Sequence, residues 1–190
     1  MAALSKVLRS LPLLLTLLAA PSEPLAHRLD EYLQATLVVL ELGRVRLQIN
    51  LGPGVDVAEQ VLLHVDRDNN HAISKNEATA YVVALQRDLA LRIDGRAAAL
   101  NLTRSAFPTP AELRSGSGII QLEFTATFST LSAGAHRFVL ENRHLSSVSV
   151  YLFNAVQPAS NAITITRQQR DPNQSAGAID FTVRTAAPMQ

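Results

Sequence analysis

The sequence has no cysteine among its 190 residues. The protein therefore forms no disulfide and no thiolate metal site, and it has no thiol to which a lipid could be attached. A chain of this length is long enough to bury a substantial core. Without disulfides, its stability must come from packing, with or without a bound ion.

The sequence also lacks an excess of charge of either sign, with 17 Lys and Arg residues against 16 Asp and Glu residues. Removal of residues 1–26 would take away Lys6, Arg9 and Glu23 and leave equal numbers of bases and acids. Nucleic acid is therefore not expected as a partner, because phosphate binding requires a basic face.

Long apolar runs are missing except near the N-terminus. There Lys6 and Arg9 precede the apolar run Leu11–Ala20, and a polar stretch containing prolines leads to Ala26. This order predicts a signal peptide over residues 1–26, cleaved after Ala20 or Ala26, with an uncleaved membrane anchor as the alternative. We therefore expect an exported protein, periplasmic or secreted, whose mature chain is soluble and has no transmembrane segment.

Alternating apolar and polar residues predict strands through most of the mature chain. In the segment 44–51, Val45, Leu47, Ile49 and Leu51 would face one side. Gly43 and Asp94-Gly95 mark two hairpin turns. We expect a mainly β fold, an antiparallel immunoglobulin-like β-sandwich of eight or nine strands, whose parts are its first strands (27–54), an insertion (55–87), its remainder (88–185) and a flexible tail (186–190).

The insertion has the periodicity of two helices. Val57, Val61, Leu62 and Val65 share one helical face before residue 66, and Ala78, Tyr81, Val82 and Leu85 share one after residue 77. The sequence thus predicts a helix–loop–helix inserted between the second and third strands.

The loop between these helices, DRDNNHAISKNE, carries oxygen donors at the positions that a twelve-residue calcium loop requires. Calcium prefers six to eight oxygen ligands, and a glutamate at the twelfth position binds it with both carboxylate oxygens. The predicted ligands of Ca²⁺ are Asp66, Asp68, Asn70, the carbonyl of Ala72, Ser74 and Glu77.

A different reading accounts for part of this loop without a metal. Ser74 and Glu77 also fit a capping box at the start of a helix. That box leaves Asp66, Asp68 and Asn70 unexplained, since three oxygens would crowd together at a helix C-terminus, where negative charge is disfavoured. His71 occupies the sixth position, where glycine is usual because the turn needs a positive φ, so the expected affinity is modest.

The filled loop positions and the flanking helices resemble an EF-hand. The stretches AHRLDEYLQAT (residues 26–36), SVYLFNA (149–155) and ITITRQQRD (163–171) resemble a group of exported bacterial β-rich proteins of unassigned function. The resemblance covers nearly the whole mature chain. Members of that group often end in a membrane helix, and no such apolar segment precedes Gln190.

Other kinds of site have little support. The histidines show no zinc-binding spacing, and the chain has no G-x-S-x-G motif of a nucleophilic serine. We therefore expect no enzymatic activity and favour a calcium-binding module of the cell envelope whose protein partner is not specified by the sequence. The alternative is a periplasmic protein that handles copper or nickel through His27, which would become the N-terminal residue after cleavage at Ala26.

Overall fold

The computed structural model describes residues 29–184. The expected signal peptide (1–26), His27 and the expected tail (186–190) lie outside the described residues. The N-terminal half of the described chain contains β1 (Tyr32–Glu41), β2 (Arg44–Pro53), the 3-10 turn η1 (Val55–Val57), α1 (Ala58–Val65), α2 (Lys75–Asp88), β3 (Leu89–Ile93) and β4 (Arg96–Ala97). The remainder contains β5 (Asn101–Ala106), α3 (Pro110–Arg114), β6 (Ile120–Thr127), β7 (Gly134–Asn142), β8 (Ser149–Ala155), β9 (Ile163–Arg170) and β10 (Ala176–Val183).

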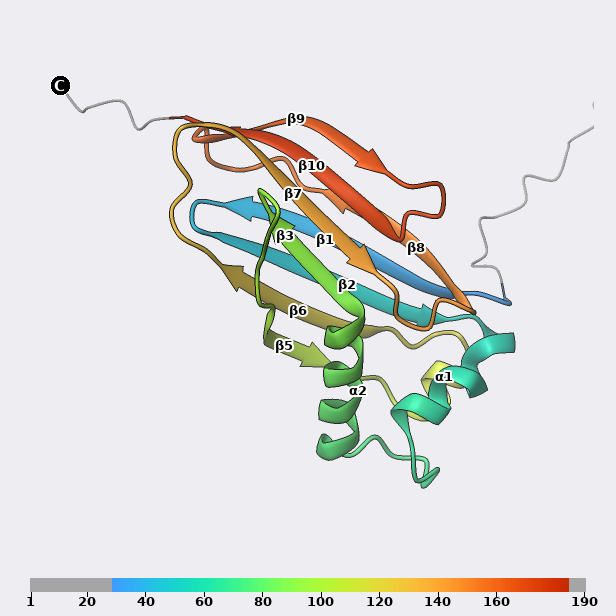
Figure 1. Ribbon diagram of the computed structural model, residues 1–190. Coiled ribbons are helices and arrows are strands. Elements are labelled where there is room, and N and C mark those ends of the chain that lie inside the picture. Colours follow the sequence, from blue (N-terminus) through green and yellow to red (C-terminus); the bar gives the residue numbers. More distant parts are fainter. Residues whose placement is uncertain (1–28, 185–190) are drawn as a thin grey trace, which may run out of the picture.

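The strands form two five-stranded sheets, which confirms the mainly β prediction. The first sheet has the order β5-β6-β2-β1-β8 and the second has the order β4-β3-β7-β10-β9. The sheets lie in two layers, and α1 and α2 lie together near one end of them (Figure 1). As expected, the helices separate the second strand from the third, and here they also carry the chain from one sheet to the other.

The core lies between the sheets and extends beneath the helices. The alternation predicted for β2 is confirmed, because Val45, Leu47, Ile49 and Leu51 are all fully buried. The helical periodicity is confirmed as well: Val61 and Val65 of α1 and Leu85 of α2 are buried in the same cluster as the strand residues. Burial of one face of each strand and helix is the main force that holds these elements together.

Both predicted hairpin turns are present. Gly43 joins β1 to β2 with a φ of 75°, and Asp94 and Gly95 join β3 to β4 with φ values of 51° and 77°. Two successive positive φ values match the twist of the flanking strands, which explains why Asp-Gly is favoured at this turn.

One pair of strands corrects the expectation of purely antiparallel sheets. β1 and β8 are parallel, with Tyr32 opposite Ser149 and Val38 opposite Ala155. After β7 the chain leaves the second sheet, crosses to the first and enters it beside β1 in the same direction. Parallel neighbours require such a crossover, and the alternation within each strand does not reveal it.

A short helix, α3, follows β5 and was not predicted from the sequence. Thr109 caps this helix, and its hydroxyl accepts a hydrogen bond from the Glu112 amide while the Glu112 carboxylate accepts one from the Thr109 amide. Leu113 is fully buried, so the helix closes the core next to α1. The prolines at positions 108 and 110 thus precede and begin a helix.

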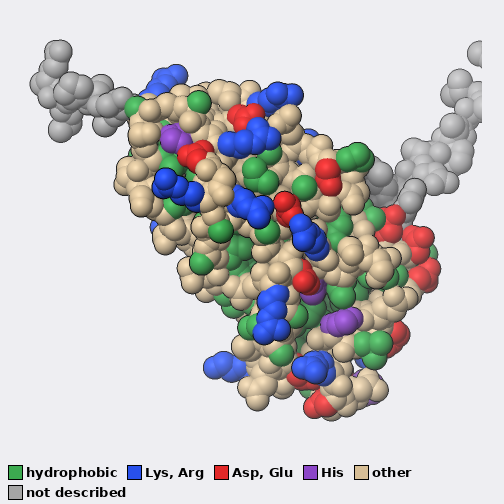
Figure 2. Space-filling model, viewed as in Figure 1, with side chains coloured by type: hydrophobic (Ala, Val, Ile, Leu, Met, Phe, Trp, Pro, Cys, Tyr) green, Lys and Arg blue, Asp and Glu red, His purple; other side chains and the backbone are tan. Residues whose placement is uncertain are grey.

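Charged side chains of both signs alternate over the face seen in Figure 2. Ion pairs join side chains of the second sheet, including Arg137 with Asp180 at 2.6 Å and Arg92 with Glu141 at 3.6 Å. Within residues 29–184 no helix has the length and apolar character needed to span a membrane.

Candidate metal site

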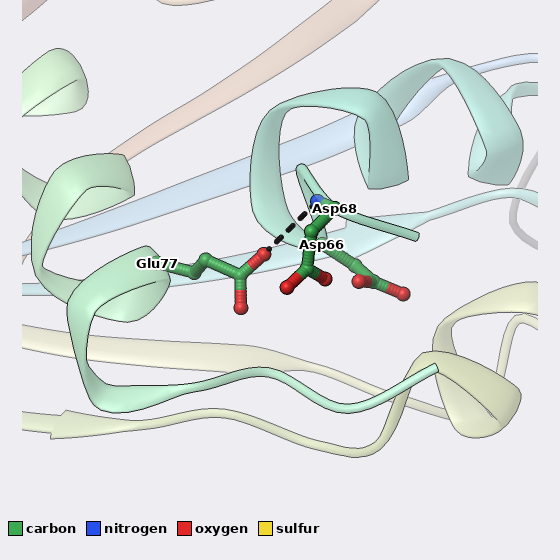
Figure 3. A group of neighbouring side chains, drawn as sticks. All are labelled: Asp66, Asp68 and Glu77. Carbon is green, nitrogen blue, oxygen red and sulfur yellow. Dashed lines mark hydrogen bonds between the residues drawn. The ribbon is translucent and has the colours of Figure 1, made fainter. Parts of the chain in front are cut away.

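The candidate site lies in the loop between α1 and α2. Asp66 caps the C-terminal end of α1, and Glu77 lies in the first turn of α2. Figure 3 shows the side chains of Asp66, Asp68 and Glu77 directed into the same space between the two helices. One carboxylate oxygen from each of the three residues lies within 4.8 Å of the others.

Hydrogen bonds from the backbone of the loop hold Asp66 and Asp68 in place. The two oxygens of Asp66 accept hydrogen bonds from the amides of Asn70 and His71, at 3.2 and 3.1 Å. Asp68 accepts hydrogen bonds from the amide and the side chain of Asn70, at 3.2 and 2.9 Å. Asp66 is almost fully buried, with 3 % of its surface exposed, whereas Asp68 is exposed. The loop therefore folds around the carboxylate of Asp66.

The loop turns through two non-glycine residues with positive φ. Asn69 has a φ of 54° and His71 has a φ of 66°. The sequence predicted a positive φ at position 71, and the structure confirms it. Asparagine and histidine are among the residues that tolerate this region best, although it still costs free energy relative to glycine.

Glu77 connects both ends of the loop. Its Oε2 accepts hydrogen bonds from the amide and hydroxyl of Ser74, at 2.9 and 2.7 Å, and its Oε1 accepts bonds from the amides of Arg67 and Asp68, at 2.7 and 3.3 Å. These bonds, led by the Ser74 hydroxyl, lower the pKa of Glu77 to about 2. Glu77 is therefore ionised over the physiological pH range. Because each oxygen already accepts two bonds, a cation would first replace the longest one, from the Asp68 amide.

No basic side chain within residues 29–184 forms an ion pair with these three carboxylates, since the ion pairs of the described chain all use other acidic residues. Carboxylates this close repel one another, and the C-terminal end of α1 adds a partial negative charge. An open groove of about 550 Å³ beside the cluster leaves room for an ion and its waters; it is lined by Arg67, Asp68, Ser74, Asn76, Glu77 and Ala80. The arrangement could therefore hold a hard divalent cation through oxygen ligands.

The structure brings only part of the predicted ligand set together. Asp66, Asp68 and Glu77 form the cluster, and Asn70 lies against both aspartates. The Asn70 side-chain oxygen accepts a hydrogen bond from the Ala72 amide, and the Ser74 hydroxyl donates to Glu77. Asn70 and Ser74 therefore use their oxygens within the loop, and Ala72 enters only through its backbone. Ile73, at the eighth position of the loop, is partly buried and packs against the core.

Beyond the loop, the structure brings together a chain of polar residues that the sequence did not predict. Tyr32, Tyr81, His144 and Asp88 form successive hydrogen bonds between their side chains. Three of these residues are almost fully buried, and Asp88 is half-buried. They come from β1, α2 and the segment after β7, so no local spacing in the sequence could have revealed them.

A comparison with known proteins adds no family to these observations: no protein-family model matches the chain, and no curated protein matches its sequence.

Proposed function

We propose that the protein is an exported, non-enzymatic calcium-binding module whose single EF-hand loop, between α1 and α2, holds a structural Ca²⁺. The observation that carries this proposal is the convergence of Asp66, Asp68 and Glu77 without a compensating base in the described chain. A divalent cation would remove their mutual repulsion and would join the end of α1 to the start of α2.

The chemistry of the donors favours calcium over other ions. The cluster offers oxygen atoms alone, whereas zinc and copper sites are usually built from histidine or cysteine. Magnesium requires near-ideal octahedral geometry and keeps much of its water, whereas calcium accepts the larger and less regular set of oxygens that a twelve-residue loop supplies. The affinity expected for such a module outside the cell is in the range of about 10⁻⁴–10⁻³ M.

A structural role suits the site better than a sensory one. The apolar faces of both helices are already buried against the sheets, through Val61 and Val65 on one side and Tyr81 and Leu85 on the other. A sensor would have to expose such a face when calcium binds. The proposed ion would instead fix the helical insertion on the sandwich. The two stacked, mainly antiparallel sheets favour an immunoglobulin-like arrangement of that sandwich. The module would then act in binding or assembly at the cell envelope.

Isothermal titration of the purified protein with calcium tests the proposal. We expect saturable heat at millimolar calcium and little competition from magnesium. The double substitution Asp66→Ala/Glu77→Gln should abolish this heat, because it removes the buried carboxylate and the bidentate ligand. A parent protein that gives no heat at millimolar calcium would show that this loop is not a calcium site.

The second capping box provides a matched control. Glu112 caps α3 in the same way that Glu77 caps α2, but no aspartates surround it in the described chain. Glu112→Gln should therefore leave the calcium titration unchanged. If this variant also lost binding, the effect of the Glu77 substitution would reflect the loss of a helix cap and would say nothing about a ligand.

A further inference from the structure

The buried polar chain Tyr32–Tyr81–His144–Asp88 joins the helical insertion to the first sheet. The Tyr32 and Tyr81 hydroxyls lie 2.5 Å apart, and the Tyr81 hydroxyl lies 3.2 Å from His144 Nε2. His144 Nδ1 lies 2.7 Å from a carboxylate oxygen of Asp88, the last residue of α2. The imidazole thus contacts α2 at two points that lie two helical turns apart.

His144 itself is held in place by its backbone. Its carbonyl accepts hydrogen bonds from Gln34 at 2.8 Å and from Ser149 and Tyr151, each at 3.1 Å. Its amide donates to the Asn142 side chain at 3.0 Å. Because β1, β7 and β8 all contribute to this set, the imidazole is a fixed point against which α2 is placed.

The partners within this polar chain determine which group donates and which accepts in each of its hydrogen bonds. The Asp88 carboxylate only accepts hydrogen bonds, so His144 Nδ1 carries a proton. When His144 is neutral, Nε2 therefore accepts from the Tyr81 hydroxyl, and the Tyr81 oxygen in turn accepts from Tyr32. In this state each donor has an acceptor, and no buried side-chain polar atom of the described chain lacks a partner.

Protonation of His144 disrupts this pattern of donors and acceptors. Nε2 would then donate to the Tyr81 oxygen, so the Tyr81 proton would have to turn toward Tyr32. Tyr32 would be left with a buried hydroxyl proton and no acceptor among the partners that it has in the structure, which costs free energy. Relief would come from movement of Tyr81, and with it α2, away from the sheet.

Tyr81 lies one helical turn after Glu77, on the same face of α2. A shift of Tyr81 therefore displaces the Glu77 carboxylate relative to Asp66 on α1. We propose that His144 is a positioning residue for the cation site: when neutral it holds α2 and Glu77 in place, and its protonation loosens α2 and weakens cation binding. This inference rests on the proposed calcium site.

The other titratable groups around His144 agree with this role. Burial lowers the pKa of His144 and outweighs the opposing effect of Asp88, and the charge of His64 on α1 lowers it further. Burial raises the pKa of Tyr32, Tyr81 and Tyr151, so the three hydroxyls stay protonated. Glu77 also keeps its charge in mild acid. Of these groups, His144 is the one whose protonation rearranges the hydrogen bonds of the polar chain.

Calcium titrations at about pH 7.5 and about pH 5.5 test the proposal, since an ordinary histidine titrates between these values. Suppose that cation binding requires a neutral His144 and that a histidine freed by the loosening of α2 has the ordinary pKa of about 6.5. Calcium affinity should then fall by up to about tenfold between pH 7.5 and pH 5.5. His144→Gln should remove this fall. Asp88→Asn, at a half-buried position that tolerates substitution better, should move it to lower pH, because the variant lacks the charge that favours the imidazolium.

Two other histidines provide controls. His71→Gln removes the imidazole inside the loop, and His136→Gln removes a histidine of β7, beside the turn between β3 and β4. Both variants should retain most of the fall. Calcium binding that does not change with pH in the parent, or that still weakens in acid in His144→Gln, would overturn this proposal and leave the calcium site intact. The absence of calcium binding at about pH 7.5 would instead contradict the proposed function, and this inference with it.

Hydrogen exchange without calcium gives an independent measurement. In the parent, amides of α2 should exchange faster at about pH 5.5, after correction for the intrinsic effect of pH, than at about pH 7.5. In His144→Gln the corrected rates should agree at the two pH values. Equal protection of α2 in the parent at both pH values would overturn the proposed loosening.

Discussion

At the scale of single residues, His71 is the clearest departure from an optimal calcium loop. Its φ of 66° lies where glycine has no penalty, so histidine costs of order 1 kcal/mol. We expect His71→Gly to tighten calcium binding by up to about tenfold if the strain falls on the bound state alone. Calorimetric titration of the two proteins measures this change.

His71→Ala is the control for this prediction, because it removes the imidazole and keeps the Cβ that makes a positive φ costly. It should bind calcium no more tightly than the parent. Binding that is unchanged or weaker in His71→Gly would contradict this prediction and would mean that calcium binding does not depend on the strain of a positive φ at position 71.

Two histidines, the buried His144 and the partly buried His136, show how the partners of an imidazole set its response to pH. His144 faces one acceptor and one hydroxyl, so it is satisfied when neutral. His136 lies 2.7 Å from the Asp94 carboxylate and 2.8 Å from the Ser132 carbonyl, and both partners only accept hydrogen bonds. Burial opposes the charge of His136, but these hydrogen bonds outweigh it and raise its pKa. The protonated imidazole thus holds the loop after β6 to the turn between β3 and β4.

A raised pKa gives this contact a defined dependence on pH. Its contribution to the free energy of unfolding is complete below the unfolded value of about 6.5 and is lost as the pH rises through the raised folded value. His136→Gln should therefore destabilise the protein at about pH 5.5 by no more than about 1 kcal/mol, since Asp94 is partly exposed. Near pH 8.5 the loss should be smaller.

Urea denaturation of both proteins at the two pH values measures this difference. His64→Gln, a substitution of an exposed histidine on α1, is the control and should show no such pattern. An equal loss of stability at acidic and alkaline pH would mean that the charge of His136 does not contribute to the contact.

At the scale of elements, the sequence predicted the strands and helices that have a continuous apolar face. β2 and α2 are recognisable because burial imposes a period of two on a strand and of about 3.6 on a helix. α3 was missed because its five residues are too few to show a period. Its capping box, Thr109 to Glu112, is nevertheless the same signal as Ser74 to Glu77, and attention to it would have revealed the helix.

The candidate site was predictable to the extent that it is local. Asp66, Asp68 and Glu77 lie within twelve consecutive residues, so the spacing alone predicts that their carboxylates converge, as they do in the structure. That an ion binds there stays a prediction. The chain through His144 could not be predicted, because Tyr32 and His144 meet only after β1, α2 and the segment before β8 have come together.

At the scale of the whole molecule, the parallel pairing of β1 with β8 brings Phe153 to the interface between the sheets. Its ring stacks on Phe138 of β7, with 6.4 Å between the ring centroids, and the edge of β8 is held by Arg170 and Gln168 of β9 through the Phe153 carbonyl. Phe153 therefore contributes to the packing between the two sheets next to β10. The separation of the sheets at this point depends on the residue that faces the ring from β10.

That residue is Gly177, and its lack of a side chain leads to the last prediction. A Cβ at this position would lie 2.3 Å from the Phe153 ring, which is buried, so the ring or the strand would have to shift. Gly177→Ala should lower the free energy of unfolding by about 1–3 kcal/mol or more through overpacking, as measured by urea denaturation. Gly52→Ala is the matched control, because a Cβ there would meet its nearest neighbour at an ordinary 3.8 Å. Equal stability of the two variants would mean that the sheets separate at Phe153 without cost, and that the close approach of β10 to β8 does not hold the layers together.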